Sequence, residues 1–150
     1  MIEFSYFYKL FLNSIKDYEI KEILEMDSDI AEDLMLTFLL KGLARFDNCH
    51  KDLENIDLDL QIINENLSLK EIIIIIDWMI IAWAERNNSD LLLSQATLGD
   101  ADFRRTPQYM ILRANEDNIN IRRERVQQDM INYDLKNTPF KEWSVGNYGL

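Results

Sequence analysis

The sequence predicts an all-α fold: a helical bundle with a long C-terminal helix and an extended C-terminal arm. Apolar residues make up 47% of the 150-residue chain, which is enough to build a buried core. Only four glycines and two prolines are present, so tight turns are scarce. Most apolar segments repeat at helical spacing, and only one alternates as a strand does. We expect three parts: a helical body over residues 1–106, a long polar helix over 107–133 and an arm over 134–150.

Two helices are predicted in the N-terminal third, followed by a helical turn in the connection over residues 17–26. The first has an apolar face with helical spacing, formed by Phe4, Phe7, Tyr8, Phe11, Leu12 and Ile15. In the second, Asp29 and Glu32 resemble a capping box, and the apolar positions recur from Met35 to Phe46. Both patterns are typical of helices that face a core.

The centre of the body is predicted to be a buried helix. Residues 68–71 (SLKE) form a capping box and open an apolar run with five consecutive isoleucines. The run from Ile72 to Ala84 spans 13 residues, which is short of the roughly 20 that cross a membrane, and Asp77 interrupts it. We expect a separate short helix to begin at Ser89 and Asp90, and a loop over residues 98–106.

Residues 56–62 (IDLDLQI) alternate strictly between apolar and polar side chains, which is a strand pattern. No second clear strand follows nearby. The segment is therefore expected to cross the helices in extended form, or to offer an edge to another chain.

The long helix is predicted to begin after the N-cap residue Thr106, with Pro107 in its first turn. A narrow apolar stripe recurs along it, formed by Tyr109, Leu112, Ile119, Val126, Met130 and Tyr133. So narrow a stripe on so long a helix predicts poor burial against its own domain. We therefore expect another protein to cover it.

The net charge of −11 is unevenly distributed. Residues 1–103 carry 21 acidic and 8 basic side chains, whereas residues 104–150 carry 6 acidic and 8 basic ones. This charge distribution predicts an acidic body and a basic C-terminal segment that binds acidic partners, including copies of the same chain. It disfavours the body as a DNA-binding surface, because phosphate neutralisation requires clustered lysine and arginine.

Six of the eight arginines lie within 22 residues: Arg104, Arg105, Arg113, Arg122, Arg123 and Arg125. Arginine forms bidentate contacts with carboxylates and phosphates, so the cluster is a candidate interface. Three interpretations stay open: carboxylates of a neighbouring subunit, a solvated helix face, and nucleic acid. We expect Arg122, Arg123 and Arg125 to pair mainly with another subunit.

The arm carries three spaced aromatic residues, Phe140, Trp143 and Tyr148, beside turn-forming residues. Aromatic side chains of this kind commonly anchor interfaces. We expect the arm to be mobile in a free subunit and to dock on a neighbouring protein in the assembly. The alternative is that it folds back onto its own bundle.

Catalytic signals are weak. The single histidine, His50, adjoins the single cysteine, Cys49, and no further residue completes a metal-ligand spacing. Asp100 and Asp102 are expected to pair with Arg104 or Arg105 at a helix entry, and Asp77 to have a perturbed pKa as a core or interface residue. The chain lacks a glycine-rich phosphate loop and a serine elbow. We predict no catalytic residue, metal or cofactor.

With these residues laid out, the chain resembles the head–tail connector or neck (adaptor) proteins of tailed bacteriophages. The resemblance rests on the segments YFYKLFLNSI, LSLKEIIIIIDWMIIAWAE, GDADFRRT and MINYD, and spans most of the chain. It implies a non-enzymatic virion protein, assembled in the host cytoplasm as a homo-oligomeric ring. Its implied partners are itself and the portal or tail proteins, with DNA passing through the bore without specific binding and with no membrane. The competing hypothesis is a phage-encoded acidic inhibitor that binds a host protein by nucleic-acid mimicry.

Overall fold

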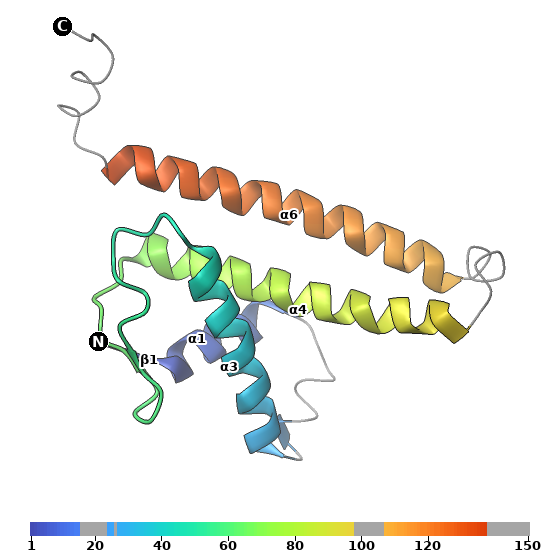
Figure 1. Ribbon diagram of the computed structural model, residues 1–150, viewed down its shortest axis with the longest axis horizontal. Helices are drawn as coiled ribbons and strands as arrows, with labels where there is room; N and C mark the ends of the chain where they lie inside the picture. The colour runs from blue at the N-terminus through green and yellow to red at the C-terminus, as the bar shows by residue number, and fades with distance from the viewer. Residues whose placement is uncertain (16–23, 26, 98–106, 138–150) are drawn as a thin grey trace, which may run out of the picture.

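The computed structural model describes residues 1–15, 24–25, 27–97 and 107–137. It confirms the predominantly helical fold with a long C-terminal helix. Helix α4 (Leu69–Thr97) is central: α3 (Ser28–Arg45) crosses it on one side, and α6 (Pro107–Asn137) runs antiparallel along it on another (Figure 1). Helix α1 (Phe4–Ser14) packs against α4 and α3. No helix within the described residues is long and apolar enough to span a membrane.

The central helix α4 begins at the predicted capping box. The Ser68 backbone N–H donates to Glu71 Oε2 at 2.7 Å, and the Glu71 N–H donates to Ser68 Oγ at 3.3 Å. These two bonds satisfy donors that a helix start otherwise leaves unpaired. The apolar run is buried as predicted, with Ile74, Ile75, Met79 and Ile81 at 0% exposure. The short helix expected from Ser89 is wrong, because α4 continues without a break to Thr97.

Helices α1 and α3 complete the main core. The predicted apolar face of α1 is buried at Phe4, Phe7, Tyr8 and Phe11. The cap expected at Asp29 is wrong: α3 begins earlier, and the Asp27 carboxylate accepts from the Asp29 and Ile30 N–H groups. Asp27 takes this role because its extended backbone places its own side chain over the first turn. Of the predicted turn over 17–26, residues 24–25 are helical, and residues 16–23 and 26 lie outside the description.

Helices α3 and α4 approach closely at Gly42. A Cβ atom added there would lie 2.9 Å from the Ile75 carbonyl oxygen and 3.2 Å from Met79 Cγ. Any side chain at this position would therefore push the two helices apart. Gly42 allows the steep crossing of α3 over the isoleucine run of α4 (Figure 1).

The alternating segment 56–62 forms a tight hairpin rather than one strand. Strands β2 (Ile56–Asp57) and β3 (Ile62–Ile63) pair with each other, and β1 (Ile2–Glu3) adds antiparallel to β3 in the order β1-β3-β2. Asp57 Oδ1 accepts from the Leu60 N–H at 2.9 Å and stabilises the turn, and Gln61 has a φ of 54°. The expected partner from another chain is not needed by β3, since the N-terminus of the same chain pairs with it.

Helix α6 buries its predicted stripe on α4, within the same chain. Leu112, Ile119, Val126, Met130 and Tyr133 are between 1% and 8% exposed. The expectation that another protein covers this stripe is therefore wrong. The helix was predicted to end at Tyr133 and the arm to begin at Asp134. Helix α6 instead continues four residues further, to Asn137, so no arm begins at Asp134.

Candidate functional site at the α4–α6 interface

The end of the interface near the α4 N-terminus is held by a buried polar network. The Tyr133 hydroxyl donates to Glu71 Oε1 at 2.8 Å and accepts from the His50 backbone N–H at 2.9 Å. Glu71 is 3% exposed, so this capping carboxylate joins the start of α4 to the last turns of α6. Burial raises the pKa of the Tyr133 hydroxyl well above its ordinary value, so it remains a donor at neutral pH.

His50 and Cys49 lie at the edge of this network. His50 Nε2 is 2.9 Å from Asp134 Oδ1, and its ring packs edge-on against Tyr133. Cys49 Sγ is 3.9 Å from the Tyr133 hydroxyl, and burial raises the pKa of the thiol. Both residues therefore contact the α6 end, as an inter-helix support rather than as a pair aimed at a ligand.

The middle of the interface is a charged cluster around Glu85 of α4. Its two carboxylate oxygens accept from Arg45 of α3 at 2.9 Å and from Arg123 of α6 at 2.8 Å. Burial by itself raises the pKa of Glu85, but the hydrogen bonds from these two guanidinium groups outweigh it and hold the pKa below its ordinary value. The Arg45 guanidinium also lies 5.6 Å from the ring centre of Trp78, whose Nε1 is 3.2 Å from Met130 Sδ.

Toward the C-terminal end of α4, the interface contains a buried amide without partners. Asn88 is 6% exposed, and both its side-chain nitrogen and its side-chain oxygen lack a hydrogen bond to any described residue. A buried polar group left unsatisfied costs about 1–3 kcal/mol. Asn88 borders a shallow hollow together with Glu116 and Arg123. The polar groups at this end of the interface are therefore less well satisfied than those around Tyr133.

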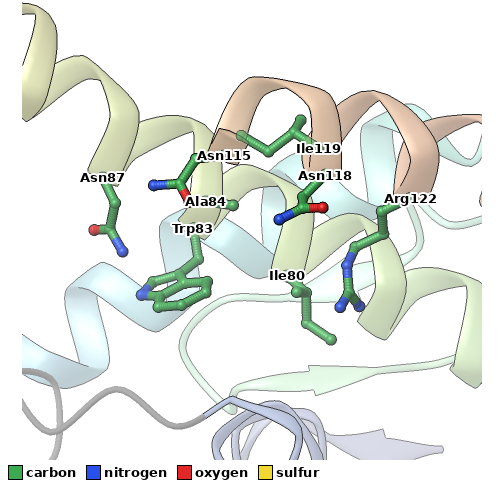
Figure 2. A pocket seen from close by; sticks show the side chains of 8 residues that line it. All are labelled: Ile80, Trp83, Ala84, Asn87, Asn115, Asn118, Ile119 and Arg122. Carbon is green, nitrogen blue, oxygen red and sulfur yellow. The ribbon is translucent and has the colours of Figure 1, made fainter. Parts of the chain in front are cut away.

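A second hollow, of about 210 Å³, opens between the same two helices on another side (Figure 2). Each helix contributes four side chains at i, i+3, i+4 and i+7: Ile80, Trp83, Ala84 and Asn87 from α4, and Asn115, Asn118, Ile119 and Arg122 from α6. Figure 2 shows Ile80 between the Trp83 indole and the Arg122 guanidinium. The floor is apolar, and three carboxamides and one cation surround it.

Asp77 lies one turn before Ile80 on α4. Burial raises the pKa of its carboxyl, the nearby Asp129 adds to this, and Arg122 and Lys70 oppose it. The expected perturbation of the Asp77 pKa is thus present in the structure.

The predicted interface arginines differ in their surroundings in the structure. Arg123 already has an intramolecular carboxylate in Glu85, whereas Arg113, Arg122 and Arg125 are exposed. Arg113 Nη1 lies 3.5 Å from the Tyr109 hydroxyl, within α6. The remaining predicted residues lie outside the described part of the chain: Arg104, Arg105, Phe140, Trp143 and Tyr148, together with Asp100 and Asp102.

Sequence reasoning missed the residues that the structure makes most informative. Glu71 was predicted only as a cap, and Glu85, Asn88 and Trp83 were not singled out. Their roles depend on which face of α4 meets α6. In a nearly all-apolar run, the spacing of apolar and polar residues does not indicate which face that is. One usable signal was the polar tail of that run, where carboxylate and carboxamide side chains replace isoleucine.

Within residues 1–15, 24–25, 27–97 and 107–137, no group of three or more His, Cys, Asp or Glu side chains is arranged to hold a metal ion. Comparison with family models, with curated proteins and with solved structures gave no match to this chain.

Proposed function

We propose that this protein is a non-enzymatic subunit of an oligomeric ring, the neck or connector that joins a phage capsid portal to the tail and lets DNA pass. The observation that carries the proposal is that α6 exposes large apolar side chains on the side that faces away from α4. Its opposite side is buried on α4, and the outward side is otherwise polar, with Asp117, Glu124 and Gln128 between the exposed apolar positions. A helix that only covered its own bundle would present polar residues outward.

The outward side of α6 exposes large apolar side chains at regular distances. Met110 is 72% exposed, and Ile121 and Leu135 are both 47% exposed. They are 11 and 14 residues apart, close to three and four helical turns, so they lie on one side of the helix. Exposed apolar residues aligned in this way favour a surface that a second protein covers.

Two arginines flank this outward side. Arg113 and Arg125 are exposed and form no salt bridge with a carboxylate among the described residues. The body of a second copy is strongly acidic, so it offers carboxylates to both cations. Apolar contact beside charge pairing is the usual composition of a subunit interface.

The proposal is tested by measuring the mass of the full chain in solution, alone and mixed with a portal protein of a tailed phage. A connector subunit is expected to form a ring-sized oligomer or to bind the portal. A monomer at all concentrations that also ignores the portal would overturn the proposal.

Reversing Arg113 and Arg125 to Glu is expected to weaken assembly without changing the thermal midpoint of the free subunit. Exposed pairs contribute only about 0–1 kcal/mol each and are screened by salt, so assembly of the unaltered chain should also weaken at high ionic strength. Arg86→Glu, on an exposed arginine of α4, is the control for each single reversal, Arg113→Glu or Arg125→Glu, because all three change the net charge equally. If the control weakens assembly equally, net charge and not the α6 surface is responsible.

Deleting residues 138–150 tests the predicted arm. If the arm docks on a neighbouring protein, as we propose, the helices α1, α3, α4 and α6 should keep their stability when it is removed. Assembly is expected to be lost, which sedimentation analysis of both chains will show. A loss of several kcal/mol in the free subunit would place the segment on its own bundle instead.

The competing proposal, an acidic inhibitor of a host protein, has one observation in its favour. Asp27, Asp29, Glu32 and Asp33 are all exposed at the start of α3. Such a group can mimic the phosphates of nucleic acid toward a basic site. A stable monomer that binds a host nuclease and releases it at high salt would favour this function over the connector.

A further inference from the structure

We infer that the hollow bounded by Trp83 and Arg122 is a binding site for a small monocarboxylate that carries one apolar ring. The inference goes beyond the proposed connector function, which assigns no ligand to this place. It rests on the size of the hollow, on its two kinds of wall and on the charges around Arg122.

Size sets the ligand class first. The hollow measures about 210 Å³. An engineered cavity of about 150 Å³ holds benzene, and drug-sized sites begin near 300 Å³. The space therefore accommodates one ring with a short substituent.

The floor favours an apolar ring. Ile80 and Ile119, which are 6% and 8% exposed, form its base, and the small side chain of Ala84 leaves the space open between the helices. The Trp83 indole forms one wall, and aromatic rings pack well against such a face. The base and this wall offer few hydrogen bonds, so a polar molecule would lose more hydration than it recovers here.

The rim favours one carboxylate. The Arg122 guanidinium is the only charged group among the eight side chains that line the hollow, and a guanidinium pairs with a carboxylate through two parallel hydrogen bonds. Asn115 and Asn118 lie on the same helix and provide further amide donors.

The charges around Arg122 favour a ligand with one negative charge over a ligand with two. Asp77 is close enough to Arg122 for the guanidinium to lower the pKa of its carboxyl, so it offsets part of the local positive charge, and Asp129 adds a second carboxylate nearby. Lys70 is paired with Asp129 at 3.4 Å. The surroundings therefore suit a single negative charge better than a phosphate dianion.

The test uses 3-phenylpropionate as the probe and the full chain labelled with ¹⁵N. Binding is followed through the indole N–H signals of the three tryptophans, with Trp83 identified from the variant Trp83→Phe. The Trp83 signal is expected to shift and saturate with a Kd of about 0.1–3 mM, in keeping with so few ligand atoms. Trp78 provides an internal control, because it is 5% exposed and lies outside this hollow.

Variants on α6 test the role of the cation. Arg122→Gln is expected to weaken binding by about fivefold or more, whereas the exposed Arg125→Gln should stay within about twofold of the unaltered chain. Both positions are exposed, so neither substitution threatens the fold. The uncharged analogue 3-phenylpropanol should bind about fivefold less tightly than the acid.

Three results would overturn the inference. The first is the absence of a saturable Trp83 shift up to about 20 mM probe, which lies well above the expected Kd. If probe binding is absent and Arg122→Gln disrupts assembly, Arg122 serves a subunit contact and the inference is still overturned. The second is an equal loss for Arg122→Gln and Arg125→Gln. The third is tighter binding of phenyl phosphate than of 3-phenylpropionate, which would contradict the assigned charge. Loss of assembly without loss of probe binding would affect only the connector proposal.

Discussion

The two ends of the α4–α6 interface differ in how their polar groups are satisfied. At one end, Tyr133 links Glu71 and the His50 backbone through bonds of 2.8 and 2.9 Å. At the other end, Asn88 is similarly buried, but its amide has no hydrogen-bond partner among the described residues, and one hollow opens beside it. Burial alone therefore does not measure how firmly two helices are held. The bonds that accompany burial decide it.

Substituting Tyr133 by Phe should have the largest effect, because it removes the centre of the well-bonded end. The Glu71 carboxylate would lose a donor and the His50 N–H would lose its acceptor, each at a cost of about 1–3 kcal/mol. We expect the free energy of unfolding to fall by about 2–4 kcal/mol in chemical denaturation. Tyr109→Phe, at the far end of α6, is the control, and a similar loss there would remove the difference between the two ends.

Substituting Asn88 by Leu should have an intermediate effect of the opposite sign. An apolar side chain of similar size removes two unsatisfied buried atoms, so we expect a gain of about 1–2 kcal/mol in the free energy of unfolding. The matched variant is Asn87→Leu at the neighbouring, less buried position, which should change stability by less than about 0.5 kcal/mol. Destabilisation by Asn88→Leu would show that the amide has a partner in solution.

Substituting Asp77 by Asn should have the smallest effect, and one that depends on pH. Burial raises the pKa of Asp77 in the folded chain, so the folded state holds its proton more tightly than the unfolded state does. The unfavourable contribution of Asp77 is therefore absent below the unfolded pKa, near 4, and is complete above the folded pKa.

We accordingly expect Asp77→Asn to stabilise the protein near pH 7 and to have no effect near pH 3. Solvent screening of this partly exposed group keeps the gain below about 1 kcal/mol. Denaturation curves at both pH values will check it. An equal gain in stability at pH 3 and pH 7 would show that packing, and not the charge of Asp77, causes the effect.

The local signals in the sequence predicted the helices well, because each rests on chemistry within a few residues. The Ser68–Glu71 box, the apolar face of α1 and the Pro107 start of α6 are of this kind. The sheet was not predicted, because one of its two pairings joins distant segments. Residues 56–62 turn locally at Asp57, but Ile2 and Glu3 pair with the second strand from about 60 residues away.

The candidate site was harder to predict than the fold. The arginine cluster was visible in the sequence, but Glu85 selects Arg123 from it, and that choice depends on the facing of α4 and α6. The hollow at Trp83 exists because Ala84 is small and lies opposite Ile119. Neither pairing leaves a trace in the spacing of residues along either helix.

By itself, the sequence determined that this chain folds as helices around a core of phenylalanines and isoleucines, with acidic residues in the body and arginines near the C-terminus. Helical periodicity and capping involve residues that are close in the sequence, so both could be predicted from it. Only the tertiary structure decided that the narrow stripe of α6 is covered by α4, because a narrow apolar stripe forms a stable contact only when its positions match those of the facing helix along the whole contact. The same matching left Asn88 without a partner and brought Tyr133 to Glu71, and these contacts, which link residues far apart in the sequence, set the two ends of the interface apart.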